Sequence, residues 1–184
     1  SFLLFQRQTQ SILMLGLGGG SLAKYCYAKL PQSRIDVVEI DPYVIGFREQ
    51  FFIPANDARF RVIHDDAARY IERRTAQYDV IMLDTFDRYG FSASIDSREF
   101  YCQARAALSP KGVLVANYIG HGGVDGLAQE RIIDRLTLNG MKNSNRLPLL
   151  VTGTCSFATY DDPDVTSVGK LCITKPDAGM IGLM

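Results

Sequence analysis

The chain has 184 residues, of which 47% are hydrophobic and 22% are charged, so it is long enough for one globular domain with a full core. Twenty basic and twenty acidic side chains cancel, which argues against nucleic acid or an anionic membrane as the main partner. The length also predicts a single domain, residues 1–184. No apolar run is long enough to span a bilayer and no signal peptide is visible, so we expect a cytoplasmic protein.

From residue 11 onward, short apolar runs alternate with segments that favour helices. Repeated units of this length predict an α/β fold with a doubly wound, mostly parallel sheet. The expected strands are Ile12–Leu15, Arg34–Ile40, Arg59–Ile63, Tyr78–Leu83 and Val113–Tyr118. The expected helices are Leu22–Leu30, Pro42–Phe52, Ala67–Arg74 and Ser97–Leu108.

Beyond Tyr118 the pattern changes. A glycine-rich loop at residues 120–123 precedes an expected helix at Asp125–Asn139, and three short β segments follow: Leu147–Thr152, Cys155–Tyr160 and Lys170–Thr174. These segments predict an antiparallel strand at the C-terminal end of the sheet.

The four cysteines are widely spaced along the chain: Cys26, Cys102, Cys155 and Cys172. They form neither a CxxC motif nor a cluster with histidine in the sequence, so the pattern predicts free thiols and a reducing compartment. We therefore expect no metal site.

The most informative signal is a strand that runs into the turn Gly16-Leu17-Gly18-Gly19-Gly20 and then into a helix. Glycines at such a turn let the backbone approach a ligand closely, although a glycine turn can also serve geometry alone. Glu39, near the end of the second predicted strand, is a carboxylate that suits the two hydroxyls of a ribose. Asp41, directly before Pro42, is better interpreted as a helix cap.

Two further acidic positions follow predicted strands. Asp66, with Ala67 after it, can bind an adenine amino group and ring nitrogen, or it can cap the next helix. Asp84 and Asp87 leave the fourth strand where a transferred group would lie, and carboxylates there can hold a cationic amine or accept its proton. The alternative for Asp84 is that it only orders its loop.

These motifs resemble the spermidine synthase family of aminopropyltransferases, in particular its divergent bacterial spermidine-synthase-like branch. The resemblance runs from Ser11 to Tyr118 and covers ILMLGLGGGS, VVEIDP, DDAARYI, DVIMLDTFD and SREFYCQARAALSPKGVLVANY. It implies a Rossmann-like fold of the S-adenosylmethionine-methyltransferase type. It also implies transfer of an aminopropyl group from decarboxylated S-adenosylmethionine to a polyamine such as putrescine, without a metal.

By this resemblance, Gly16, Gly18 and Gly19 would contact the co-substrate, Glu39 would hold its ribose, and Asp66 with Ala67 would hold its adenine. Asp84 would be the catalytic residue at the reacting amine, and Asp87 would bind the acceptor.

The sequence departs from the family pattern at three places. Gly19 stands where family members carry an aspartate that grips the aminopropyl amine, and the loop after Asp84 contains Phe86 and Arg88. The family's N-terminal β-hairpin domain is also expected to be absent.

Two other functions therefore stay open. One is methyl transfer from S-adenosylmethionine, and the other is a non-catalytic nucleoside-binding domain. The expected partner is a small-molecule amine, with no nucleic acid or membrane, and a homodimer is the candidate assembly.

Overall fold

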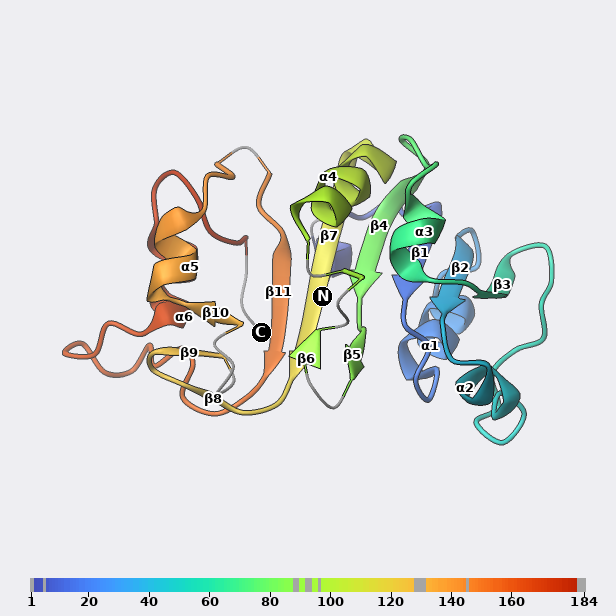
Figure 1. The fold of residues 1–184 in the computed structure, drawn as a ribbon, viewed down its shortest axis with the longest axis horizontal. Coiled ribbons are helices and arrows are strands. Elements are labelled where there is room, and N and C mark those ends of the chain that lie inside the picture. The colour runs from blue at the N-terminus through green and yellow to red at the C-terminus, as the bar shows by residue number, and fades with distance from the viewer. Residues whose placement is uncertain are drawn as a thin grey trace. The chain divides into compact units, whose positions relative to one another are not determined.

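In a computed structural model, the chain is described for residues 2–4, 6–87, 90–91, 94–95, 97–127, 132–144 and 146–181 (Figure 1). It divides into two compact units, Ser1–Leu114 (unit 1) and Val115–Met184 (unit 2). The sequence analysis expected a single domain, and that expectation stays a prediction, since a division into compact units does not test it. Within the described ranges, no helix is long and apolar enough to cross a membrane.

Unit 1 is built on a parallel sheet with β2 between β1 and β3 (Figure 1). Its strands are β1 (Ser11–Leu15), β2 (Arg34–Glu39), β3 (Phe60–His64) and β4 (Tyr78–Leu83), and β4 pairs in parallel with the other side of β1. In the register, Leu13 lies between Asp36 and Ile81. The strand β7 (Leu108–Ile119) begins in unit 1 and ends in unit 2. The predicted apolar runs are therefore confirmed as strands whose carboxyl ends meet at one edge.

The described helices of unit 1 are η1 (Phe2–Leu4), α1 (Ser21–Lys29), α2 (Pro42–Gly46), α3 (Ala67–Ile71) and α4 (Arg98–Ala107). Side chains cap the last three of them. Asp41, Asp66 and Ser97 each accept a hydrogen bond from a backbone N–H in the first turn of the helix that follows. Helix α2 ends at Gly46 rather than at the predicted Phe52: after Gly46 the chain continues in turns, in which the Arg48 N–H donates to the Ile45 carbonyl at 3.1 Å, and Phe52 itself has a φ of 54° that a right-handed helix cannot contain.

Two of these helices cover one face of the sheet. Leu13, Leu15 and Ile81 point to this face and pack with Tyr70 of α3 and Phe100 of α4 in one buried cluster. The strand side chains alternate, so that Ile12 and Met14 fill the opposite face and are also buried. A short antiparallel pair, β5 (Phe86–Asp87) and β6 (Gly90–Phe91), follows β4.

A buried polar network crosses the core of unit 1. Asp36, which is 1% exposed, accepts a hydrogen bond from the Tyr78 hydroxyl at 3.0 Å and pairs with Arg61 at 2.8 Å. The Tyr78 hydroxyl also lies 3.2 Å from that of Tyr70. Burial raises the pKa of Tyr78 well above its ordinary value, so its hydroxyl keeps the proton that it donates to Asp36.

Unit 2 joins a parallel strand pair to a small antiparallel sheet. The end of β7 pairs in parallel with β11 (Leu149–Gly153). The antiparallel strands are β8 (Gly122–Gly123), β9 (Gly126–Leu127) and β10 (Ile133–Asp134), and the helices are α5 (Arg135–Gly140) and α6 (Val168–Thr174).

The sequence prediction for this part is only partly confirmed. Antiparallel pairing is present in the small sheet, but the last strand, β11, runs parallel to β7. The segment Lys170–Thr174, predicted as β, lies in α6, because Ser167 caps a helix there with its hydroxyl. The helix expected at Asp125–Asn139 is confirmed only as the shorter α5, since glycine at position 126 adopts a φ of 158° in β9. Residues 128–131 lie outside the described part.

We expect Tyr78→Phe to lower the free energy of unfolding by about 1–3 kcal/mol, because it leaves a buried oxygen of Asp36 without its donor. Tyr27→Phe is the matched control, since the Tyr27 hydroxyl donates to Asp57 at an exposed position; it should change the free energy of unfolding far less. Urea denaturation of both variants measures the difference, and equal effects would contradict a structural role for the buried network.

Candidate functional site

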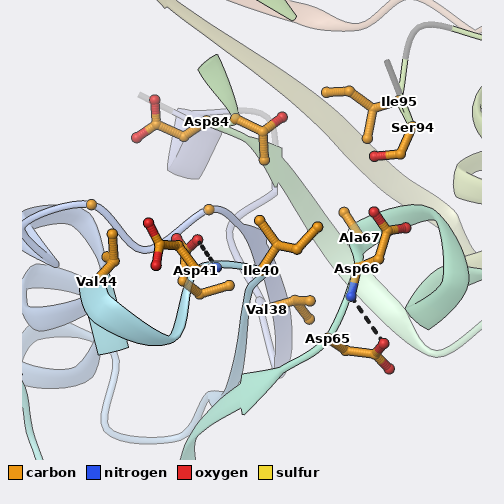
Figure 2. A pocket seen from close by; sticks show the side chains of 14 residues that line it. Val38, Ile40, Asp41, Val44, Asp65, Asp66, Ala67, Asp84, Ser94 and Ile95 are labelled. Atoms are coloured by element: carbon orange, nitrogen blue, oxygen red, sulfur yellow. Dashed lines mark hydrogen bonds between the residues drawn. The ribbon is translucent and has the colours of Figure 1, made fainter. Parts of the chain in front are cut away.

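The carboxyl ends of the unit 1 strands surround a cavity of about 370 Å³ (Figure 2). In an open α/β sheet this is the edge at which ligands bind. In Figure 2 the side chains of Asp41, Asp66 and Asp84 come from the ends of three different strands, β2, β3 and β4. The lining residues are Gly16, Gly18, Val38, Glu39, Ile40, Asp41, Val44, Asp65, Asp66, Ala67, Asp84, Thr85, Ser94 and Ile95.

Glu39 fixes the glycine turn to the end of β2. One carboxylate oxygen accepts the backbone N–H of Leu17 at 2.9 Å, and the other accepts that of Asp41 at 2.9 Å. Both bonds are charge-assisted, so they hold the turn more strongly than neutral bonds would. Each carboxylate oxygen keeps further lone-pair capacity, which ribose hydroxyls can use.

Gly16 makes the close contact between the glycine turn and the end of β4. Its φ is 100°, and a Cβ atom added to it would lie 2.2 Å from the backbone oxygen of Asp84. The N–H of Asp84 donates to the carbonyl of Leu15 at 2.9 Å, and the N–H of Gly16 donates to that of Val38 at 2.8 Å. Only glycine therefore permits the approach that brings Asp84 beside the turn.

Asp66 serves as the cap that the sequence allowed and also lines the cavity. Its Oδ1 accepts the N–H of Arg69 at 3.0 Å, while its own N–H donates to Asp65 at 2.9 Å (Figure 2). Ala67 begins α3 directly after it and lines the same cavity.

The cavity brings together most of the residues singled out in the sequence. Gly16, Gly18, Glu39, Asp66, Ala67 and Asp84 all line it. Gly19 is not among the lining residues, and a Cβ atom there would lie 3.8 Å from the ring of Phe51. Asp87 lies in β5, but its side chain and the whole of Arg88 fall outside the described part of the chain. The roles given to these residues stay predictions.

The charge of the cavity is strongly one-sided. Five carboxylates line it: Glu39, Asp41, Asp65, Asp66 and Asp84. Among the described lining residues there is no lysine, arginine or histidine. Such a cavity attracts cations and disfavours an anionic group. Within the described ranges, no group of three or more histidine, cysteine or acidic side chains is arranged to hold a metal ion.

The sequence analysis gave no site role to several of the lining residues, among them Thr85, Ser94 and Ile95. Thr85 follows Asp84 directly, so its place after a strand end was a usable signal. Ser94 and Ile95 come from the segment after β6, and nothing local in the sequence indicates their position.

Unit 2 places a histidine and a cysteine at one strand edge. Ile119 of β7 pairs with Gly153 of β11, so His121 and Cys155 each lie two residues beyond a paired position on neighbouring parallel strands. A Cβ atom on Gly122 would lie 2.3 Å from Thr154 Oγ1 and 3.2 Å from the backbone oxygen of Cys155, which shows how closely the two loops approach. The sequence pattern indicated no such pair, because the two residues are far apart along the chain.

The loop that carries His121 is held by Tyr118, whose hydroxyl donates to the His121 backbone carbonyl at 2.7 Å. His121 and Cys155 are both exposed. Burial instead raises the pKa of the thiols of Cys26 and Cys172 to about 11, so these two stay protonated and unreactive at neutral pH.

Comparison with known proteins shows relatives of two kinds. A polyamine aminopropyltransferase of Vibrio vulnificus is 39% identical over 118 residues, which is 62% of this chain and 40% of the relative. A probable spermidine synthase of Corynebacterium glutamicum has a similar structure, with a TM-score of 0.53 and 31% identity over 58% of this chain and 39% of the neighbour. Human methyltransferase-like protein 13 in complex with SAH gives a TM-score of 0.53 and 31% identity over 60% of this chain and 55% of the neighbour.

The model of peptidase family C25 matches residues 40–184, which include all of unit 2. The chain belongs to this peptidase family over those residues, and about 60% of its length is related to the spermidine synthase, or polyamine aminopropyltransferase, family. It spans about 40% of the length of the Vibrio relative. The predicted resemblance and the Rossmann-like methyltransferase fold are thereby confirmed, whereas the peptidase match was not foreseen.

We expect Gly16→Ala to lower the free energy of unfolding by at least about 1–3 kcal/mol, since the positive φ alone costs that much for a residue with a Cβ. Gly46→Ala is the control, because nothing lies within 4 Å of its added Cβ. Chemical denaturation tests the pair, and a Gly16 variant as stable as the Gly46 variant would contradict the close approach to Asp84.

Proposed function

We propose that the cavity of unit 1 binds a nucleoside sulfonium co-substrate and transfers its aminopropyl group to an amine such as putrescine. The observation that supports this best is the set of five carboxylates around the cavity, because both substrates are cations. The glycine turn and Glu39 suit the nucleoside, and Asp84 suits the amine.

The reaction proposed here is a direct displacement. The lone pair of a neutral amine attacks the carbon next to the sulfonium, a C–N bond forms as the C–S bond breaks, and methylthioadenosine leaves as a neutral thioether. The amine nitrogen gains positive charge as it reacts, and Asp84 stabilises that charge and accepts the proton. Holding donor and acceptor in line supplies much of the remaining acceleration.

The same charges argue for the decarboxylated donor. The carboxylate of full S-adenosylmethionine would enter a cavity whose described lining carries five acids and no basic side chain. The similarity to methyltransferase-like protein 13 keeps methyl transfer as the alternative for this cavity. Calorimetry with S-adenosylmethionine and its decarboxylated form separates the two: tighter binding of the decarboxylated form is expected, and the reverse order would favour methyl transfer.

We expect Asp84→Asn to lower kcat for aminopropyl transfer to putrescine by about 10²–10⁴-fold, since it removes the proton acceptor. The affinity for methylthioadenosine should change little, because the asparagine is nearly isosteric and lies on the amine side of the cavity. Asp57→Asn, at an exposed position outside the cavity lining, is the control. Asp84→Asn with unchanged turnover would refute the role given to Asp84.

A second activity is proposed for unit 2, because the peptidase match covers it and the β7–β11 register brings His121 and Cys155 to one edge. His121 would take the proton of the Cys155 thiol, and the thiolate would attack a peptide carbonyl carbon. The C–N bond breaks as His121 returns the proton to the leaving amine. Water then hydrolyses the thioester that remains on Cys155.

We expect Cys155→Ala and His121→Ala each to reduce hydrolysis of fluorescently labelled casein by at least about 10³-fold, as removal of a nucleophile or its base does in other hydrolases. Cys102→Ala is the matched control, because Cys102 is also an exposed free thiol but lies on α4 of unit 1. Equal losses in the Cys102 and Cys155 variants would refute the assignment.

A further inference from the structure

One threonine that lines the unit 1 cavity has a buried hydroxyl group for which the described residues supply no hydrogen-bond partner. Thr85 lines the cavity directly after Asp84, and its Oγ1 is inaccessible to solvent without a hydrogen-bond partner among the described residues. A buried hydroxyl left in this way costs about 1–3 kcal/mol relative to a bonded one. A ligand that binds in the cavity and forms a hydrogen bond with this hydroxyl would remove that cost.

The methyl group of Thr85 lies on the side of the glycine turn. A Cβ atom added to Gly16 would lie 3.3 Å from Thr85 Cγ2, so the methyl group of Thr85 faces the glycine turn at the place where that turn meets Asp84. The hydroxyl shares the same Cβ and therefore points in a different direction from the methyl group.

In the proposed reaction, the attacking nitrogen of a primary amine can use two hydrogen-bond acceptors. A neutral primary amine directs its lone pair at the carbon and has two N–H groups left. The Asp84 carboxylate can accept one of these, and a threonine hydroxyl, which has two lone pairs, can accept the other. Both groups lie in consecutive positions at the end of β4 and line one cavity.

We propose that the Thr85 hydroxyl is the second hydrogen-bond acceptor for the reacting primary amine and thereby selects primary over secondary amines. This inference rests on the aminopropyl transfer proposed above. Asp84 takes the proton that the nitrogen loses on C–N bond formation, whereas Thr85 orients the nitrogen through the N–H that it keeps. A secondary amine has a single N–H, which Asp84 satisfies, so Thr85 contributes nothing to its reaction.

The test compares Thr85→Val, which keeps the shape and loses the hydroxyl, with Thr85→Ser, which keeps the hydroxyl. The acceptors are putrescine and N,N′-dimethylputrescine, whose amines are all secondary. For Thr85→Val we expect kcat/KM to fall about tenfold with putrescine, the value of one hydrogen bond, and less than about threefold with the dimethyl compound. Thr85→Ser should stay within about threefold of the parent chain with both.

Thermal unfolding of the free chain supplies an independent readout. Thr85→Val should be as stable as the parent chain or more stable, because it removes a buried group that lacks a partner. A less stable variant would show that the hydroxyl is already bonded in the fold and would overturn the inference, as would equal losses with the two amines or no loss with putrescine. If the parent chain binds no methylthioadenosine and makes no aminopropyl product, the proposed function itself fails.

Discussion

The close contact between Gly16 and the backbone of Asp84 is the constraint on which the unit 1 site depends. β1 and β4 are neighbouring parallel strands, so their ends reach the same edge of the sheet. The turn after β1 can pass the Asp84 carbonyl there only because Gly16 has no Cβ. Glu39 then fixes the turn to the end of β2 through two backbone N–H groups. The ends of β1, β2 and β4 are thus joined at one edge, and the acidic residues at the ends of β2, β3 and β4 line the cavity there.

Much of this arrangement was predictable, because its causes are local or periodic. Continuous apolar runs predict strands that are covered on both faces, and parallel strands that share an edge bring Glu39, Asp66 and Asp84 together without knowledge of any contact. The helix ends were less predictable. α2 stops at Gly46, where the chain passes into turns that lead to a positive φ at Phe52, and an apolar pattern does not encode that change. Thr85 was missed for a similar reason, since a buried hydroxyl without a partner shows itself only once the packing around it is known.

The C-terminal part shows where reasoning from the sequence fails. Short apolar segments are compatible with strand or helix, and at Lys170–Thr174 the cap provided by Ser167 favours the helix. The proximity of His121 to Cys155 depends on the register between β7 and β11, which joins segments more than thirty residues apart. From their spacing along the chain, His121 and Cys155 look unrelated. In the fold, each follows by two residues a position that is paired between β7 and β11.

The distribution of carboxylates in the cavity bears on which groups accelerate the proposed transfer and which only bind. The donor enters as a sulfonium and leaves as a neutral thioether, while the acceptor nitrogen becomes positive, so positive charge moves from sulfur to nitrogen during the reaction. Carboxylates near the nucleoside stabilise the donor before the reaction and lower KM, but they gain nothing in the transition state. Asp84 stands at the end of β4 beside the glycine turn, where the new charge would form. An acid there interacts more strongly with the transition state than with the substrates, which is the condition for raising kcat.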